Sequence, residues 1–369
     1  MWAAHMKSLI EQPATEHPVV LTPETIVGYC ENLALPQLEG ALSAADSSTG
    51  NLNFCFIISA EAGGSVFVKQ APDFVRVLGE DAKLTTDRIR IEASAALEFI
   101  DLAPGLLPQL YHFDASSCVL VMEHLGSHVL LQDKLIAGEV SDAPAVGIAQ
   151  FMAKVHGATF GSERLSSFSN EALCGITQAY VFTLPFIADD SNSNMPALDE
   201  TVAAIRANEP LLAAIKAALG IFNSKKEALL HGDLHAGSVM TDGTDAKVID
   251  HEFAFYGPAG FDLGLFLAGY TFPWASAVAH KDEAKAAAIV SAMTACVTEY
   301  TTAMVASQGA EVAAAIWADA LSFMGCELLR RVLGVAKRAD LEQISDAATK
   351  LQAEKIVCLV GQRVIERGS

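Results

Sequence analysis

The chain has 369 residues, enough for two lobes that each have a hydrophobic core of their own. Its 24 lysines and arginines stand against 44 aspartates and glutamates, which gives a net charge of −20. Such a surface repels the phosphates of nucleic acids and of anionic membranes, so we exclude both as partners.

Seven cysteines are scattered along the chain, without a Cys-x-x-Cys pair that would indicate a zinc site. Their odd number favours a reducing compartment. The start, MWAAHMKSLIEQ, is too short and too polar for a secretory signal. We therefore expect a cytoplasmic protein.

The first predicted elements form a hairpin that ends on a lysine. A strand at 54–59 follows the loop residues Gly50, Asn51 and Asn53, the sequence EAGG turns the chain, and the strand VFVK ends on Lys69. In kinases, a loop over the nucleotide phosphates precedes a strand lysine in this order. These loop residues and Lys69 are therefore candidates for nucleotide binding, although a simple turn would also explain Gly50 and Asn51.

A helix is predicted over the segment DRIRIEASAALEFIDL, where apolar residues recur with helical spacing. Asp87, its first residue, is a suitable N-cap. Glu92 lies in the second turn, where a pair with Lys69 would hold the lysine against nucleotide phosphates. The alternative for Glu92 is an exposed helix charge, as for most glutamates in helices.

A second hairpin is predicted, with strands at 109–113 and 118–122. In a two-lobed kinase, the chain crosses between the lobes after such a hairpin, and backbone groups of the crossing can bind the edge of an adenine. Met122, Glu123 and His124 are therefore candidate adenine contacts, and a plain linker is the alternative for the same residues.

The chain after residue 122 is mostly helical in pattern. Alanine-rich and apolar runs predict helices at 142–160, 196–220, 281–307, 309–337 and 340–366, the last one capped by Asp340. His156 is interpreted as a hydrogen-bonded core histidine. Because two glycines and Pro273 interrupt the apolar stretch 263–279, we expect a buried helix followed by an irregular loop there, not a membrane span.

Residues 231–252, HGDLHAGSVMTDGTDAKVIDHE, carry the clearest chemistry. Three short strands are predicted around them, at 228–230, 238–241 and 246–249. This hairpin would bring Asp233, Asp250 and Glu252 together, which suits phosphoryl transfer: one carboxylate accepts the proton of a substrate hydroxyl and the others hold magnesium. Each acid alone would be an ordinary loop residue, but their order follows the catalytic and metal-binding loops of kinases.

These patterns predict an α+β protein with a two-lobed, protein-kinase-like fold. Residues 1–122 would form an N-lobe of antiparallel sheet with one main helix, which carries the phosphate loop. Residues 123–369 would form a mostly helical C-lobe with the catalytic loop, the metal site and, as the resemblance described below implies, the sugar site. ATP is expected to bind between the two.

The motifs resemble those of the 5-methylthioribose kinases, within the wider group of aminoglycoside- and choline-kinase-like phosphotransferases. The similar segments cover most of the chain and are GNLNF, VKQAPDFVRVLGE, TTDRIRIEA, HGDLHAGS, IDHEFAFYGPAGFDLG and ELLRRVLG. The HGDLH loop alone indicates the wider group. The longer segments FAFYGPAGFDLG and VKQA…VRVLGE, together with the paired arginines, are typical of the methylthioribose kinases.

The resemblance implies that Asp233 is the catalytic base and that Asp250 and Glu252 bind Mg²⁺ as an Asp-x-Glu motif. Two positions depart from the expected pattern. Ser238 stands where protein kinases have a metal-binding Asn, and its hydroxyl is a weaker ligand. His251 stands where many relatives would have Pro; it could be a solvent-facing spacer, or it could make metal binding depend on pH.

The resemblance also implies that Lys69 binds nucleotide phosphate with Glu92 as its partner. Arg330 and Arg331 would lie near the transferred phosphoryl group and the sugar, although by themselves they would be read as a solvated helix face. Because ATP is an anion and the chain is acidic, local positive charge must surround the site. These cations and Arg76 are the candidates.

The reaction implied by the resemblance is transfer of the ATP γ-phosphoryl group to the 1-hydroxyl of 5-methylthioribose in methionine salvage, by a homodimer. One alternative is another small-molecule kinase, acting on choline, homoserine, an aminoglycoside or a different sugar. Another is a nucleotide-binding pseudoenzyme that acts as a scaffold. A cationic substrate would require an acidic pocket, and the paired arginines argue against one.

Overall fold

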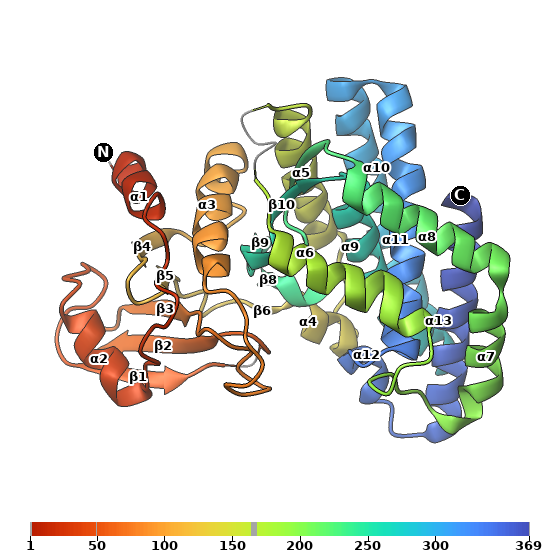
Figure 1. Ribbon diagram of the computed structural model, residues 1–369, viewed down its shortest axis with the longest axis horizontal. Helices are drawn as coiled ribbons and strands as arrows, with labels where there is room; N and C mark the ends of the chain where they lie inside the picture. The colour runs from red at the N-terminus through yellow and green to blue at the C-terminus, as the bar shows by residue number, and fades with distance from the viewer. Residues whose placement is uncertain (1, 49, 164–167, 369) are drawn as a thin grey trace. The chain divides into compact units, whose positions relative to one another are not determined.

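A computed structural model describes residues 2–48, 50–163 and 168–368 of the protein (Figure 1). The chain divides into two compact units. Unit 1 comprises Met1–Ser127 and the short segment Ile249–Ala254, and unit 2 comprises His128–Val248 and Phe255–Ser369. The structure thus groups the segment that carries Asp250 and Glu252 with unit 1.

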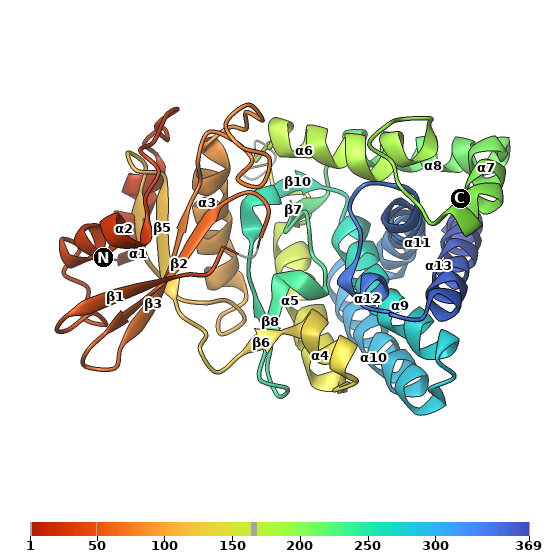
Figure 2. The same ribbon diagram turned by 90° about the horizontal axis from the view of Figure 1, so that it is seen from below.

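Unit 1 is built on a five-stranded antiparallel sheet in the order β1–β2–β3–β5–β4 (Figure 2). The strands are β1 (Leu42–Asp46), β2 (Phe54–Ala60), β3 (Ser65–Gln70), β4 (Leu110–Asp114) and β5 (Val119–Glu123). Both predicted hairpins form, and the turn between β2 and β3 is closed by Gly64, whose carbonyl accepts the N–H of Ala60 at 2.8 Å.

Helices cover both faces of this sheet. They are α1 (Trp2–Ile10), α2 (Pro23–Glu31) and α3 (Asp87–Leu102). Ile26 and Cys30 of α2 pack on the face that carries the valines of β3 and β5. Apolar residues of α3 and α1 pack with Leu110 and Leu120 on the opposite face. Because successive strand residues point to opposite faces, the alternating pattern fixes which strand side chains meet α3.

Unit 2 is mostly helical, and α9 (Gly260–Ala279) is buried along nearly its whole length. It packs against α10, α11 and α13. The other helices are α4 (Leu131–Ala137), α5 (Asp142–Thr159), α6 (Glu171–Thr177), α7 (Asp199–Ala207), α8 (Glu209–Ser224), α10 (Glu283–Gln308), α11 (Ala310–Leu333), α12 (Ala339–Glu342) and α13 (Ala347–Gly368). A six-residue π-helix, Gln178–Thr183, follows α6.

Two small sheets flank the HGDLH loop. One has the order β6–β8–β9, and the other pairs β7 with β10. Their strands are β6 (Val129–Leu130), β7 (Ala228–Leu230), β8 (Val239–Thr241), β9 (Lys247–Val248) and β10 (Phe255–Gly257). The three strands predicted around the loop are present. β7 has the predicted bounds, β8 is one residue shorter than predicted, and β9 is two residues shorter.

The prediction of an irregular loop within 263–279 is wrong, because α9 continues through Pro273 to Ala279. A proline inside a helix removes one backbone hydrogen bond and crowds the preceding turn. Here burial against three other long helices outweighs that cost, as tertiary packing commonly does with local propensity.

Two of the predicted helices are interrupted. The run 196–220 breaks at Asn208, whose side chain caps α8 by accepting the N–H of Leu211 at 3.2 Å. The run 340–366 breaks before α13, where Asp346 accepts the N–H of Thr349 at 2.8 Å. The side chain of Asp340 pairs with Arg338, so Asp340 does not cap the last helix.

The predicted cap of α3 is also wrong. Asp87 is the first residue of the helix itself, and its carboxylate pairs with Arg90 one turn later. Thr86 occupies the N-cap position. An acid in the first turn still interacts favourably with the helix dipole. Asp87 therefore marked the beginning of the helix correctly, but the N-cap is one residue earlier than predicted.

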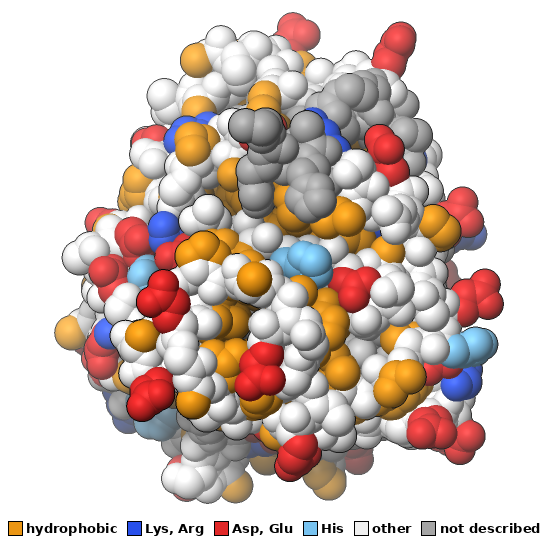
Figure 3. Space-filling model, turned by 90° about the vertical axis from the view of Figure 1, so that its left-hand side faces the viewer, with side chains coloured by type: hydrophobic (Ala, Val, Ile, Leu, Met, Phe, Trp, Pro, Cys, Tyr) orange, Lys and Arg blue, Asp and Glu red, His pale blue; other side chains and the backbone are white. Residues whose placement is uncertain are grey.

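The outer surface is acidic, and two helices are strongly apolar. Figure 3 shows acidic side chains spread over one face of the molecule, with fewer lysines and arginines among them. By length and composition alone, α10 and α11 could cross a membrane. The most apolar window of α11 is 67% buried inside the structure, which is usual for the core helix of a globular unit.

The crossing of α11 over α13 requires glycine at position 325. A Cβ atom there would lie 2.3 Å from Cγ1 of Ile365 and 2.5 Å from the carbonyl oxygen of Gly361. We expect Gly325→Ala to lower the free energy of unfolding by about 1–3 kcal/mol, because overpacking forces the helices apart. Urea unfolding measures this change.

Gly220→Ala in α8 is the matched control, because no atom lies within 4 Å of its added Cβ. It should raise the free energy of unfolding by about 0.4–1 kcal/mol, because alanine lowers the conformational entropy of the unfolded chain. A Gly325→Ala protein as stable as the parent would show that the helices separate at little cost.

Candidate active site

The ammonium group of Lys69 is the centre of a buried charge cluster in unit 1. It lies 2.8 Å from Oε2 of Glu92, 2.9 Å from Oδ1 of Asp250 and 3.4 Å from Oε1 of Glu252. Lys69 is the fifth residue of β3, Glu92 comes from α3, and both acids of the Asp-x-Glu motif come from the segment 249–254. The structure thus brings together four of the residues that the sequence singles out.

Arg88 and Asn53 complete the cluster from its other side. Nδ2 of Asn53 donates to both carboxylate oxygens of Glu252 at 2.9 Å, and its Oδ1 accepts from Nε of Arg88 at 3.0 Å. Arg88 is fully buried and lies 3.4 Å from Glu252. The sequence assigned Asn53 to the phosphate loop, whereas in the structure its side chain orients an acid of the cluster.

The cluster holds three carboxylates and two cations, so it carries an excess of negative charge. Burial raises the pKa of Glu92 to about 7; Lys69 opposes this shift, and Glu252 and Asp250 add to it. Burial alone would lower the pKa of Lys69, but the three acids raise it well above its usual value. One further cation would balance the group.

The donor set of this cluster fits a divalent metal ion. Asp250 and Glu252 offer carboxylate oxygens, the ligands that Mg²⁺ prefers, and the local charge is negative. The side chain of Asp250 is 52% exposed, whereas those of Lys69 and Glu92 are buried, so the cluster is open on the Asp250 side. Asp250 has a left-handed backbone (φ 63°), a conformation that Asp adopts more readily than most residues.

His251 is buried, which contradicts its interpretation as a solvent-facing spacer. It is 4% exposed, and its ring packs edge-on against Phe99 of α3 with centroids 5.5 Å apart. The middle residue of the Asp-x-Glu motif therefore anchors the segment 249–254 to the core of unit 1, while its two neighbours face the cluster.

The predicted phosphate loop is held by backbone contacts. Asn51 accepts the N–H of Val77 at 3.1 Å through its carbonyl oxygen. The guanidinium of Arg76 donates to the carbonyl of Ser48 at 2.7 Å and to that of Gly50. Arg76 is thus a structural residue of this loop, in addition to being a candidate for offsetting the charge of ATP.

The candidate adenine contacts lie at the end of β5. Met122 and Glu123 pair with β3, opposite Phe67 and Val66. His124 follows the strand, and its Nδ1 lies 2.8 Å from the hydroxyl of Ser65. This side-chain contact of His124 is therefore within unit 1, and a role of this segment in adenine binding stays a prediction.

The HGDLH loop in unit 2 is fixed by a buried carboxylate. Oδ2 and Oδ1 of Asp262, in the first turn of α9, accept the N–H groups of His231 at 2.7 Å and Gly232 at 2.9 Å. His156 is buried beside Asp262 and bonds the hydroxyl of Tyr300 at 2.9 Å. The prediction of a hydrogen-bonded core histidine is therefore confirmed.

Asp233 follows these residues in the loop. Its backbone carbonyl accepts the hydroxyl of Ser238 at 2.8 Å, so the Ser238 side chain binds the loop itself. Burial opposes ionisation of Asp233, but His235, Arg331 and Arg330 outweigh it and hold the pKa of the carboxyl well below its usual range. Asp233 is therefore ionised at neutral pH, as a proton acceptor must be.

One buried glutamate orients both arginines. Glu327 of α11 lies one turn before Arg330 and Arg331; its Oε1 accepts from Nε of Arg331 at 2.6 Å, and its Oε2 accepts from Nε of Arg330. Neither guanidinium is a solvated helix face, because both side chains are about one-tenth exposed. The two guanidinium groups therefore share one hydrogen-bonded carboxylate, and the charges of both act on Asp233.

Sequence reasoning missed Arg88, Asp262 and Glu327. Glu327 had a local signal, since it stands three and four residues before the paired arginines, the spacing of neighbours on one helix face. Asp262 lies within the segment FAFYGPAGFDLG, but its partners are about 30 residues earlier. For Arg88, the partner Glu252 lies in a distant part of the chain, and no local pattern points to it.

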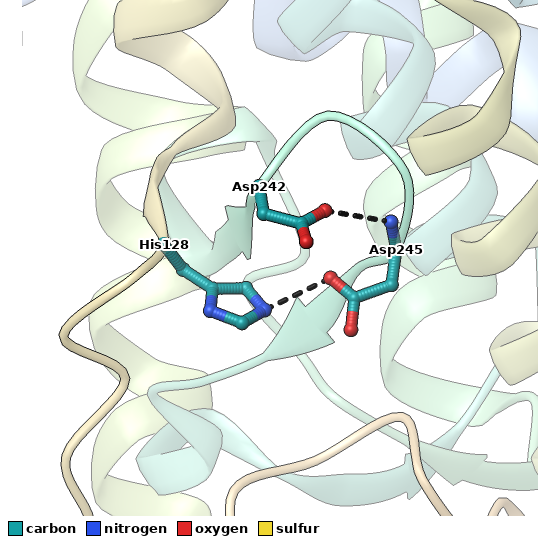
Figure 4. Close-up of side chains that lie close together, drawn as sticks. All are labelled: His128, Asp242 and Asp245. Atoms are coloured by element: carbon teal, nitrogen blue, oxygen red, sulfur yellow. Dashed lines mark hydrogen bonds and ion pairs between the residues drawn. The ribbon is translucent and has the colours of Figure 1, made fainter.

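A further His–Asp group lies at the turn between β8 and β9 (Figure 4). Nε2 of His128 lies 2.9 Å from Oδ1 of Asp245, and Oδ2 of the same carboxylate lies 3.7 Å from Nζ of Lys247. Asp242 accepts the N–H groups of Thr244 at 2.8 Å and Asp245 at 3.1 Å. These contacts close the Asp-Gly turn and attach it to the start of β6.

Residues 60–294 match the phosphotransferase enzyme family. The crystal structure of choline kinase from Cryptosporidium parvum shares the fold, with a TM-score of 0.51 and 12% identity over 94% of this chain and 95% of that one. The fold and the two charge clusters therefore define a protein-kinase-like phosphotransferase.

More similar chains are known by sequence. The methylthioribose kinase of Bacillus thuringiensis is 31% identical over 94% of this chain and 92% of its own length. The methylthioribose kinase of Yersinia enterocolitica is 34% identical over 88% of each chain. The chain belongs to the methylthioribose kinase family.

The raised pKa of Glu92 predicts a pH dependence of stability. Its pKa of about 7 in the folded protein lies above the ordinary value of 4.5, so the bound proton favours the folded state. This contribution is complete below pH 4.5 and is lost as the pH rises through about 7. The free energy of unfolding, measured without divalent cations, should therefore fall over this range, and Glu92→Gln should flatten the fall.

Glu80→Gln is the matched control, because Glu80 is exposed and lies outside the cluster. This variant should follow the parent at every pH. An unchanged pH dependence in Glu92→Gln would show that folding does not raise the pKa of Glu92.

Proposed function

We propose that the protein is an ATP-dependent kinase that phosphorylates the 1-hydroxyl of 5-methylthioribose and so forms 5-methylthioribose 1-phosphate for methionine salvage. The observation that carries this proposal is the set of acids gathered on buried Lys69 in a chain whose relatives are methylthioribose kinases over nearly their whole length. A scaffold without catalysis would have no reason to keep so costly a group of buried charges.

Lys69 is proposed to bind the phosphates of ATP, with Glu92 holding its ammonium in place. The pair is 2.8 Å apart and buried, so the lysine has little freedom to leave the position that a nucleotide would meet. Gly50 and Asn51 are proposed to bind the phosphates of ATP, and the backbone at 122–124 is proposed to contact the adenine. Unit 1 is in this proposal the nucleotide-binding lobe, close to the predicted 1–122.

Asp250 and Glu252 are proposed to hold Mg²⁺. When bound, the ion supplies positive charge that neutralises the developing charge on the β- and γ-phosphates. Asn53 and Arg88 fix the orientation of Glu252, while Asp250 presents its half-exposed carboxylate. Ser238 has no proposed role on the metal, since its hydroxyl donates to the carbonyl of Asp233.

Asp233 is proposed to align the sugar hydroxyl and to accept its proton as the γ-phosphoryl group transfers. In a loose phosphoryl-transfer transition state, little covalent assistance is required, so alignment of the nucleophile and stabilisation of charge dominate. Arg330 and Arg331 would supply that stabilisation. Glu327 accepts a hydrogen bond from each of them and so fixes the orientation of both guanidinium groups.

The acceptor is proposed to be a neutral sugar. Two buried arginines act on Asp233, and positive charges at this place disfavour cationic acceptors such as choline or an aminoglycoside. An ADP-release panel with 5-methylthioribose, other sugars, homoserine, choline and aminoglycosides tests this choice. Faster turnover of any other acceptor would reassign the substrate.

The resemblance further predicts a homodimer in the cytoplasm. Light scattering of the purified protein determines its mass against 39.0 kDa for one chain, and a monomer at working concentration would reject the dimer. The acidic composition of the chain predicts that neither nucleic acid nor membranes are partners.

Replacing Asp233 should abolish turnover while leaving the nucleotide site intact. We expect Asp233→Asn to lower kcat at least about 100-fold, because the amide cannot accept the proton, with ATP affinity unchanged. Steady-state kinetics and nucleotide titration measure the two effects. Asp101→Asn, an exposed residue of α3, is the control; a fall of less than about tenfold in Asp233→Asn would exclude it as the base.

The paired arginines should act through the geometry of their guanidinium groups. Arg331→Lys keeps the charge but loses the planar set of donors, so we expect kcat/KM for the sugar to fall about tenfold or more. Arg363→Lys, whose side chain is 70% exposed on α13, should behave as the parent. Equal kinetics for both variants would place Arg331 outside the site.

A further inference from the structure

His235, two residues after Asp233, has both ring nitrogens in defined surroundings. Its Nδ1 accepts the N–H of Gly237 at 2.9 Å, and its Nε2 lies 3.6 Å from Oδ2 of Asp233. A backbone N–H can only donate, so Nδ1 must be unprotonated for this bond to form. The neutral ring therefore carries its proton on Nε2, the nitrogen that faces the carboxylate.

The neutral form is also favoured by the charges around the ring. Burial lowers the pKa of His235; Asp233 opposes this shift, and the positive charges of Arg338 and Arg331 add to it. Asp340 is a further acid near the ring. At neutral pH the ring is thus a fixed N–H donor, and it cannot take a proton from Asp233 because its other nitrogen is occupied by the backbone.

The backbone is shaped to hold this ring in place. A Cβ atom on Gly237 would lie 2.7 Å from Cε1 and 2.9 Å from Nδ1 of His235, so only glycine lets the ring lie against the chain. A Cβ on Gly269 of α9 would come within 3.1 Å of the backbone nitrogen of Ala236. The loop is therefore pressed against a core helix on one side and closed by the ring on the other.

We propose that His235 is a positioning residue for Asp233: its Nδ1 is fixed to the loop, and its Nε2–H is directed at the Asp233 carboxylate and holds it in the orientation that meets the sugar hydroxyl. This inference rests on the proposed function, in which Asp233 is the base. The distance of 3.6 Å is longer than a hydrogen bond, as catalytic contacts commonly are before substrate orders the site, and the proposal requires it to shorten when the sugar binds.

Two substitutions separate the two nitrogens. In His235→Asn, the side-chain oxygen replaces Nδ1 and can still accept the N–H of Gly237, since Asn readily binds the backbone two residues on. That variant lacks any group at the position of Nε2. In His235→Gln, the amide reaches the position of Nε2 and can donate to Asp233, but the bond to Gly237 is lost.

We expect His235→Asn to keep the melting temperature and the KM for ATP of the parent and to lose about 10- to 100-fold in kcat, the usual effect of misplacing a catalytic group by about 1 Å. Removing this donor should raise the pKa of Asp233, because the donor favours the ionised carboxylate. In the pH profile of kcat/KM for the sugar, the loss of activity on acidification should therefore begin at a higher pH than in the parent. His235→Gln should retain kcat within about threefold of the parent, since its donor remains.

Parental turnover in His235→Asn would overturn the proposal. So would equal losses of kcat and melting temperature in both variants, because the ring would then only hold the loop together. Long-range ¹⁵N NMR of histidine-labelled protein, assigned by comparison with His235→Asn, should show a neutral ring protonated on Nε2; protonation on Nδ1 would also overturn it. If the parent does not phosphorylate 5-methylthioribose at all, the proposed function fails, while the NMR result still decides the state of the ring.

Discussion

The burial of the Lys69 ammonium is the constraint on which the first half of the site depends. Burying a charge away from water costs free energy unless ionic partners surround it. Removing one partner therefore destabilises the protein, because it leaves a buried charge uncompensated. The partners of Lys69 come from α3 and from Asp250 and Glu252 of the segment 249–254, which follow Lys69 by 181 and 183 residues. The same contacts that poise the acids therefore also fold this segment into unit 1.

The two units use different charge balances. The cluster of unit 1 has more acid than base, which suits a divalent cation, whereas in unit 2 the charges of Arg330 and Arg331 are offset by Glu327 and Asp233. In a chain with a net charge of −20, these positive side chains are buried at defined points, where they are screened less than on the surface.

Local patterns in the sequence predicted the parts of the structure that local chemistry determines. The hairpin ending at Lys69, the helix carrying Glu92 and the turn after β8 follow from alternation, helical spacing and an Asp-Gly pair. The breaks before α8 and α13 were missed because their caps, Asn208 and Asp346, resemble ordinary polar residues within a helical run. Arg88 could not be placed, because its acid partner Glu252 meets it only in the folded chain.

The HGDLH loop depends on the core through α9. Asp262 lies in the first turn of this helix, where the dipole favours a negative charge, and it uses both carboxylate oxygens on the loop backbone. The packing of α9 against three helices is what keeps that carboxylate buried beneath His231 and Gly232. Because one helix serves both purposes, a change that loosens its packing must also release the loop that carries Asp233, so the stability of unit 2 and the position of Asp233 are coupled more closely than at an exposed site.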